Sequence, residues 1–156
     1  MKTWYMIITL VLTSCATVDN QANGVIYNEY KEYKALVDAG DEVSASAKIS
    51  QSYLEGLREV DTITSAELGL HTPYWKYFAN IINTEYSHFE KIDGDIGCLT
   101  INGLDKLDRP RSLSLYYIRE HGIWVFNRFG ITAHSSIREY YTEPTCPNLE
   151  SLKRES

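Results

Sequence analysis

The sequence predicts an α+β domain in which helices come first and an antiparallel sheet follows. Apolar residues recur at helical spacing between Ile26 and Ile82, whereas from Glu85 onward they alternate with polar residues, as in strands with one buried face. Asp93-Gly94 separates two such alternating runs and is typical of a β-hairpin turn. Helices that precede a meander of strands are expected to pack on one face of the sheet.

The helical half is predicted as several short segments. One face of the first helix consists of Ile26, Tyr30, Tyr33 and Val37. Gly40 is placed to end this helix, and Asp41 is placed to cap a second segment that extends, whole or broken, to about residue 60. Thr72-Pro73 starts a further helix, because Pro is tolerated in a first turn. Its expected apolar face consists of Trp75, Phe78, Ala79 and Ile82.

Four strands are predicted in the second half. They are Glu85–Ile92, Ile96–Asn102, Leu113–Arg119 and Ile123–Ile131. A polar loop over Asp105–Arg111 joins the middle two strands, and Glu120-His121-Gly122 forms a tight turn between the last two. We expect His121 to be exposed in that turn. Residues after Thr142 are expected to be loosely ordered, because they are polar and contain two prolines.

The first fifteen residues have the pattern of an export signal. Lys2 precedes the apolar run Trp4–Leu12, which is too short to cross a bilayer as a helix. Leu12-Thr13-Ser14-Cys15 follows and resembles the lipobox of bacterial lipoproteins. This resemblance implies that the chain is cut before Cys15 and that Cys15 carries the lipid that anchors the protein. The alternative is an ordinary secretory peptide with a chance cysteine.

The same resemblance implies a location in the cell envelope. Ala16 rather than Asp follows Cys15, which in a Gram-negative cell implies an outer-membrane anchor with the domain on the periplasmic face. A Gram-positive host would hold the anchor in its single membrane. The expected divisions are a signal peptide over residues 1–14, the lipidated Cys15 with a tether over 15–24, the α+β domain over 25–142 and a C-terminal tail over 143–156.

Charge argues against nucleic acid as a partner. The chain has a net charge of −6, and its Lys and Arg residues are scattered apart from Lys153-Arg154. Proteins that bind nucleic acid neutralise phosphates with many basic side chains. We therefore expect no nucleic-acid partner, and the acidity is better explained by solubility.

Cys98 and Cys146 are the two cysteines that follow Cys15. In an oxidising compartment such a pair commonly forms a disulfide. A bridge between them would close a loop of about 49 residues and stabilise the fold by roughly 4 kcal/mol. The alternative is two free thiols, with Cys98 acting as a small buried apolar side chain.

Two segments suggest a fold family. They are Ile92-Asp93-Gly94-Asp95-Ile96-Gly97-Cys98-Leu99-Thr100-Ile101 and, later, Tyr117-Ile118-Arg119-Glu120-His121-Gly122-Ile123-Trp124-Val125. Together with the order of elements, they resemble the nuclear transport factor 2-like superfamily of cone-shaped domains. The resemblance covers about residues 25–131 and implies helices packed on a curved antiparallel sheet. The chain departs from the family around residues 61–72, where the middle helix is interrupted.

Aromatic residues are the remaining lead to a binding site. A possible pocket between helices and sheet would be lined by Trp75, Phe78, His88, Tyr117 and Trp124. Such a pocket suits a small hydrophobic ligand. The alternative is that the aromatic side chains fill the core and leave no hollow.

No catalytic residue, cofactor or metal is assigned from the sequence. The histidines His71, His88, His121 and His134 are widely separated, and no two have the spacing of metal ligands on one helix. The expected function is a lipid-anchored binding or accessory module whose partner is a small hydrophobic ligand or an envelope protein. One alternative, a structural envelope protein, would work through protein partners alone.

The other alternative is a pocket enzyme. Cone folds with enzymatic activity resemble steroid isomerases or dehydratases, which use a buried Asp or His beside Tyr hydroxyls. Residues considered for that chemistry are His88, Glu90, Tyr86 and Tyr117.

Overall fold

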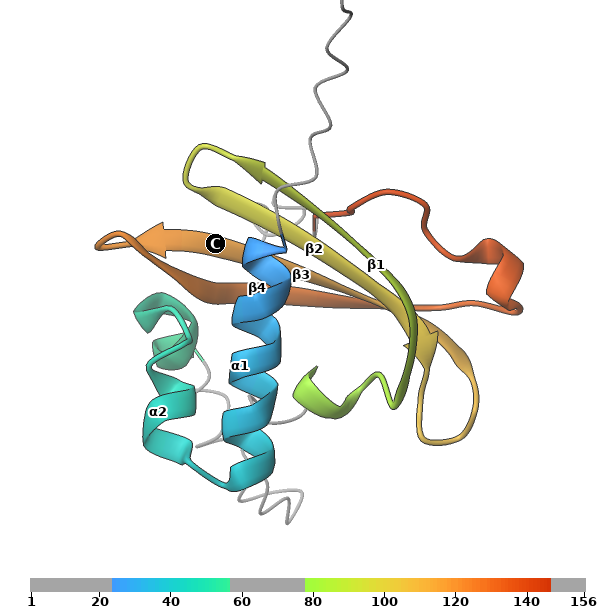
Figure 1. The fold of residues 1–156 in the computed structure, drawn as a ribbon, viewed down its shortest axis with the longest axis horizontal. Helices are drawn as coiled ribbons and strands as arrows, with labels where there is room; N and C mark the ends of the chain where they lie inside the picture. Colours follow the sequence, from blue (N-terminus) through green and yellow to red (C-terminus); the bar gives the residue numbers. More distant parts are fainter. Residues whose placement is uncertain (1–23, 57–77, 147–156) are drawn as a thin grey trace, which may run out of the picture.

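Figure 1 shows the computed structural model of the chain, which describes residues 24–56 and 78–146. Helices α1 (Val25–Ala39) and α2 (Glu42–Ser46) precede a four-stranded antiparallel sheet, and residues 51–56 are also helical. The strands lie side by side in chain order: β1 (Thr84–Asp93), β2 (Ile96–Leu104), β3 (Pro110–Glu120) and β4 (Ile123–Ala133). Two short 3₁₀ helices flank the sheet, η2 (Phe78–Asn80) and η3 (Ile137–Glu139). The predicted α+β arrangement of helices on a curved antiparallel sheet is confirmed.

Helix α1 begins where strand β1 supplies an acceptor for its free amides. The Glu90 carboxylate accepts hydrogen bonds from the backbone N–H groups of Val25 at 3.0 Å and Tyr27 at 2.9 Å. The first amides of a helix have no partner inside the helix, so a carboxylate there satisfies them and complements the helix dipole. Gly40 follows the last turn with a φ of 73°, as the sequence predicts.

The segment after α1 turns towards the edge of the sheet. Asp41 caps α2 by accepting a hydrogen bond from the Ser44 N–H at 3.1 Å, which confirms its predicted role. The backbone then runs beside β4, where the Phe126 N–H donates to the Lys48 carbonyl at 2.8 Å. In return, the Ser50 N–H donates to the Phe126 carbonyl at 2.7 Å. This parallel pairing covers the edge of β4 at Phe126.

Both two-residue hairpin turns contain residues with positive φ. Gly94 has a φ of 59° at the first position of the β1–β2 turn, which glycine adopts without a steric penalty. The turn is therefore Gly94-Asp95, one residue later than the predicted pair. In the β3–β4 turn, His121 has a φ of 52° and Gly122 a φ of 83°, as a type I′ turn requires. His121 is exposed, as predicted.

Two predicted boundaries are wrong. Within the described residues, the helix expected to include Ile82 is represented by the 3₁₀ turn Phe78–Asn80 and ends before Ile82, and its predicted start at Thr72-Pro73 lies outside these residues. Ile82 is still buried, because the chain after this turn packs on the core. Strand β3 begins at Pro110 rather than Leu113, since its pairing with β2 extends into the predicted loop. A proline is tolerated at the first residue of a strand.

One face of the sheet packs on α1 and η2. The largest fully buried apolar side chains of β2 and β3 face it: Leu99, Ile101, Leu113, Leu115 and Tyr117. At one end, Gly97 allows close packing, since a Cβ there would lie 2.6 Å from Ile26 of α1 and 3.5 Å from Trp124. Trp124 therefore lies beside α1.

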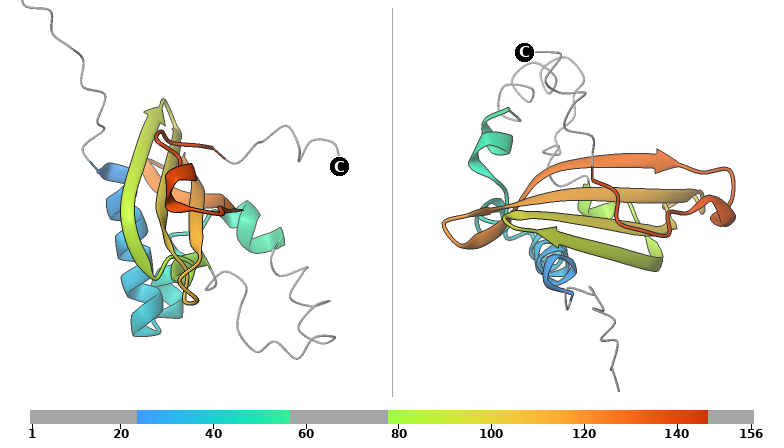
Figure 2. Two further views of the ribbon diagram at one scale, coloured as in Figure 1. Left: turned by 90° about the vertical axis from the view of Figure 1, so that its right-hand side faces the viewer. Right: turned by 90° about the horizontal axis from the view of Figure 1, so that it is seen from above.

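The opposite face of the sheet is covered by residues 134–146, which return across it after β4 (Figure 2). We call this segment the strap. The Tyr140 hydroxyl donates to the Gly103 carbonyl at 2.6 Å, and the Thr145 N–H donates to Thr100 Oγ1 at 2.7 Å. The first residues of the predicted tail, 143–146, are thus held against β2 rather than loosely ordered. Residues 147–156 lie outside the described residues.

Candidate functional site

The residues predicted to line a pocket do not lie around a common hollow. Phe78, Tyr117 and Trp124 belong to the core between the helices and the sheet. His88 lies at the exposed surface of β1, and Trp75 lies outside the described residues. The described members of the predicted set therefore occupy two separate environments.

Stacked aromatic rings fill the space in which the sequence placed the pocket. The rings of Phe78 and Phe126 stack with their centroids 4.1 Å apart, and Tyr33 stacks on Phe78 at 4.7 Å. Tyr117 meets the edge of Phe126 at 5.9 Å. Offset stacking and edge contacts at these distances are the favourable arrangements of aromatic side chains. The core interpretation of these residues is thus the one that the packing supports.

Two of the residues considered for isomerase or dehydratase chemistry, His88 and Glu90, have structural partners. His88 stacks on Tyr27 with ring centroids 3.6 Å apart, and its Nδ1 lies 2.8 Å from the Glu85 carboxylate. Desolvation and the hydrogen bond to Glu85 raise the pKa of Tyr27 to about 12, so its hydroxyl remains a donor at neutral pH. Glu90 binds the start of α1, and Tyr86 is 54% exposed. These contacts orient α1 on β1.

Tyr117 has a buried hydroxyl with no hydrogen-bond partner among the described residues. Burial raises the pKa of this phenol well above its ordinary value, so the group is a neutral, dehydrated hydroxyl. Because an unpaired buried hydroxyl loses hydration without compensation, we expect Tyr117→Phe to raise the free energy of unfolding by about 1 kcal/mol. Urea denaturation measures this change.

The matched control for this prediction is Tyr30→Phe. The Tyr30 hydroxyl is also buried, but it donates to the Ala79 carbonyl at 3.4 Å. Its removal should therefore not stabilise the protein. A clear loss of stability in Tyr117→Phe would show that the Tyr117 hydroxyl makes a bond that the prediction excludes.

A serine of β3 and the first residue of the strap, a histidine, meet in a geometry that resembles a nucleophile and its base. Ser112 Oγ lies 2.7 Å from His134 Nε2. The Asn102 amide decides the direction of the bonds, because its Nδ2 donates to the Tyr141 carbonyl at 2.8 Å and its Oδ1 therefore faces Ser112 at 2.6 Å. Ser112 gives its single proton to Asn102 and accepts one from His134. His134 is a donor here, and the cluster ties the strap to the sheet.

The two cysteines predicted to pair lie close together at the end of the strap. Cys98 of β2 and Cys146 are at disulfide distance, with their Cα atoms 5.2 Å apart. That separation lies within the range that disulfides span. The predicted lipidation residue, Cys15, lies outside the described residues.

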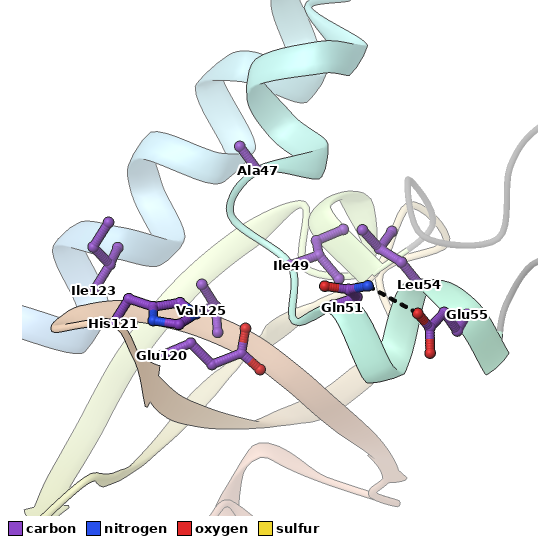
Figure 3. Close-up of a pocket in the computed structure, with 9 residues that line it drawn as sticks. All are labelled: Ala47, Ile49, Gln51, Leu54, Glu55, Glu120, His121, Ile123 and Val125. Atoms are coloured by element: carbon purple, nitrogen blue, oxygen red, sulfur yellow. Dashed lines mark hydrogen bonds between the residues drawn. The ribbon is translucent and has the colours of Figure 1, made fainter.

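An open hollow lies beside the β3–β4 hairpin (Figure 3). One wall is formed by the chain from the end of α2 into helical residues 51–56, and the other by the hairpin. The hollow has a volume of about 410 Å³. Its lining consists of Ala47, Ile49, Gln51, Leu54, Glu55, Glu120, His121, Ile123 and Val125. None of the residues that the sequence suggested for a pocket is among them.

The floor of the hollow is apolar and held in place by backbone hydrogen bonds. Ile49 and Val125 are 4% and 6% exposed. The Lys48–Ser50 segment pairs with Phe126, the residue after Val125, so the backbones of the two walls are joined at this point. Ile123, by contrast, is 58% exposed at the outer end of the hairpin wall. An apolar ligand group placed in the hollow would remove such surface from water.

The polar residues of the lining are Gln51, Glu55, Glu120 and His121. Gln51 donates to the Glu55 carboxylate at 3.0 Å, whereas the side chains of Glu120 and His121 make no hydrogen bond or ion pair with any described residue. The Glu120 side chain extends from the hairpin towards the wall that carries Gln51 and Glu55 (Figure 3). The nine lining residues include no Lys or Arg.

The basic residues next to the lining already have partners. Lys48 binds Glu29 at 2.8 Å and Glu32 at 2.6 Å. The Arg119 guanidinium lies over the Trp124 ring, 4.5 Å from its centroid. Within residues 24–56 and 78–146, no Lys or Arg is paired with the carboxylates of the hollow.

Sequence reasoning missed this hollow, because its two walls are about 70 residues apart in the chain. The available signal was local. The predicted turn placed Glu120 and His121 next to the apolar residue Ile123, which alternation leaves on an exposed hairpin end.

Within residues 24–56 and 78–146, no group of three or more His, Cys, Asp or Glu side chains is arranged to hold a metal ion. No helix of this part of the chain has the length and apolar composition needed to cross a membrane. No protein-family model matches the chain, and no curated protein or solved structure matches it significantly.

Proposed function

We propose that this chain is a lipid-anchored protein of the bacterial cell envelope that acts by binding a partner. The export signal and the Leu12-Thr13-Ser14-Cys15 tetrad support the anchor. The open hollow beside the β3–β4 hairpin is the observation that carries the binding role, because its lining combines apolar side chains with two carboxylates and contains no Lys or Arg. In a Gram-negative cell, the protein would lie at the periplasmic face of the outer membrane.

The packing of the core favours binding over the isomerase or dehydratase alternative. That chemistry needs an acid or base inside an apolar cavity that also admits the substrate. In this protein the corresponding space holds the stacked rings of Tyr33, Phe78 and Phe126.

The nuclear transport factor 2-like cone is part of the same proposal. Two features support it, namely the order of elements, with helices before a four-stranded meander, and the packing of α1 on one face of the curved sheet. The resemblance of the Ile92–Ile101 and Tyr117–Val125 segments, which form the two hairpin ends, points the same way.

Replacing the anchor residue tests the location. In Cys15→Ser we expect complete loss of labelling by radioactive palmitate and accumulation of the uncut precursor, because the thiol that takes the lipid is gone. Metabolic labelling followed by gel electrophoresis measures both. Cys146→Ser is the control and should keep its label. Undiminished labelling of Cys15→Ser would refute the anchor.

A further inference from the structure

We infer that the hollow beside the β3–β4 hairpin binds a segment of a partner protein in which a Lys or Arg side chain is flanked by aliphatic residues. This inference rests on the proposed binding function and names the chemistry of its partner. It is drawn from the lining of the hollow and from the charges around it.

The first step concerns charge. Glu55 on one wall and Glu120 on the other are the carboxylates of the lining, and no Lys or Arg belongs to it. In the part of the chain that the structure describes, the basic residues next to the lining are Lys48, which binds Glu29 and Glu32, and Arg119, which lies over Trp124. A basic side chain from outside would therefore meet two acceptors with free oxygens, and an acidic one would be repelled.

The second step concerns the apolar surface. Ile49 and Val125 form the floor, and Ile123 extends that surface outward while remaining 58% exposed. Aliphatic residues on either side of the basic one would cover Ile123 and contact the floor. The aliphatic stem of Lys or Arg itself packs on apolar surface while its charged end stays near the rim.

The third step concerns the shape. The hollow is open, and its walls come from separate elements joined by the Lys48–Ser50 pairing with Phe126. An open site with a rigid floor suits a chain segment that lies across it, whereas a small ligand is usually enclosed on most sides. His121 lies at the hairpin tip with a φ of 52° and contributes an exposed side chain to the lining.

Capped pentapeptides provide the test. We would titrate the purified protein, as isolated from cells, with Leu-Ala-Lys-Ala-Leu and with versions that carry Glu or norleucine at the centre. Chemical shifts of backbone amides report the site and the dissociation constant. We expect the Lys peptide to shift Glu120–Val125 and residues 47–55, the norleucine peptide to bind at least about threefold more weakly, and the Glu peptide not to bind.

Variants of the lining sharpen the test. Glu120→Gln and Glu55→Gln should each weaken binding of the Lys peptide about three- to fivefold. Both variants should bind the norleucine peptide with the same affinity as the unaltered protein. Ile123→Ala should weaken all peptides that bind. Glu143→Gln, which alters an exposed carboxylate on the strap, is the matched control and should change nothing.

Three results would overturn the inference: equal binding of the Lys and Glu peptides, shifts confined to another surface, or insensitivity to both glutamine variants. A further variant ends at Cys146 and so lacks residues 147–156. If this variant bound the Lys peptide more tightly than the full chain, the chain's own tail would be the occupant of the hollow, and the inference would also be overturned. Palmitate labelling of Cys15 is scored separately, so failure of the peptide test is distinguishable from failure of the anchor.

Discussion

Removing the Cys98–Cys146 pair is expected to lower the free energy of unfolding by about 4 kcal/mol, because a bond between residues 48 apart restricts the unfolded chain. The folded protein should lose local order as well. Cys146 is the last described residue of the strap, and Thr145 next to it exchanges hydrogen bonds with Thr100. Without the bridge, these contacts alone hold the end of the strap on β2.

Chemical denaturation of the Cys98→Ser/Cys146→Ser variant, in the absence of reductant, measures the loss. Treating the unaltered protein with a thiol reductant should reproduce it, whereas the double variant should not respond to reductant. This second comparison separates the bridge from any effect of placing Ser at the buried position of Cys98, which is 7% exposed. Quantitative alkylation of both thiols in unreduced, unfolded protein would refute the bridge.

Elements fixed by local chemistry were predictable from the sequence. Gly40 and Asp41 end one helix and cap the next through contacts within a few residues, and both predictions are confirmed. The turn at His121-Gly122 was likewise predictable, because positive φ at two successive positions is a local requirement of tight hairpins. The prediction of a helix that includes Ile82 is wrong for the opposite reason, because packing on the core, and not local helix propensity, decides where the 3₁₀ turn ends.

The alternation of apolar and polar residues identified the strands, but it did not show that both faces of the sheet are buried. Along β2, Leu99 and Ile101 face the helices, while Thr100 and Asn102 face away and are equally buried. The sequence suggests that a polar face is solvated, because nothing local shows that the strap returns to cover it. The hydrogen bonds of Asn102 with Ser112 and Tyr141 depend on residues 10 and 39 positions away.

The candidate site shows the same limit. Hollows arise where elements distant in sequence meet. Here the two walls, which include Ile49 and Val125, are brought together by one isolated bridge between Ile49 and Phe126. Aromatic content was compatible with a pocket as well as with a filled core, and the filled core was the favoured interpretation. Only the placement of Phe78 between Tyr33 and Phe126 decides for the core.

Truncating Phe126 tests that core and is expected to cost about 3–5 kcal/mol of stability in Phe126→Ala. The side chain is fully buried and contacts four aromatic rings, those of Phe78 at 4.1 Å, Tyr53 at 5.2 Å, Tyr117 at 5.9 Å and Phe129 at 6.3 Å. Its backbone also pairs with Lys48 and Ser50, so the residue joins the sheet to the segment that forms one wall of the hollow. A cavity at this position would loosen both.

Because domains are stable by only about 5–15 kcal/mol, Phe126→Ala should remove a large share of the total and could leave the chain largely unfolded. Phe126→Leu keeps most of the volume and should retain a folded protein with a smaller loss. Val43→Ala, at a side chain 83% exposed on α2, is the control and should change stability by less than about 0.5 kcal/mol. If denaturation showed Phe126→Ala and Val43→Ala to be equally stable, the stacked core would not be the feature that stabilises this fold.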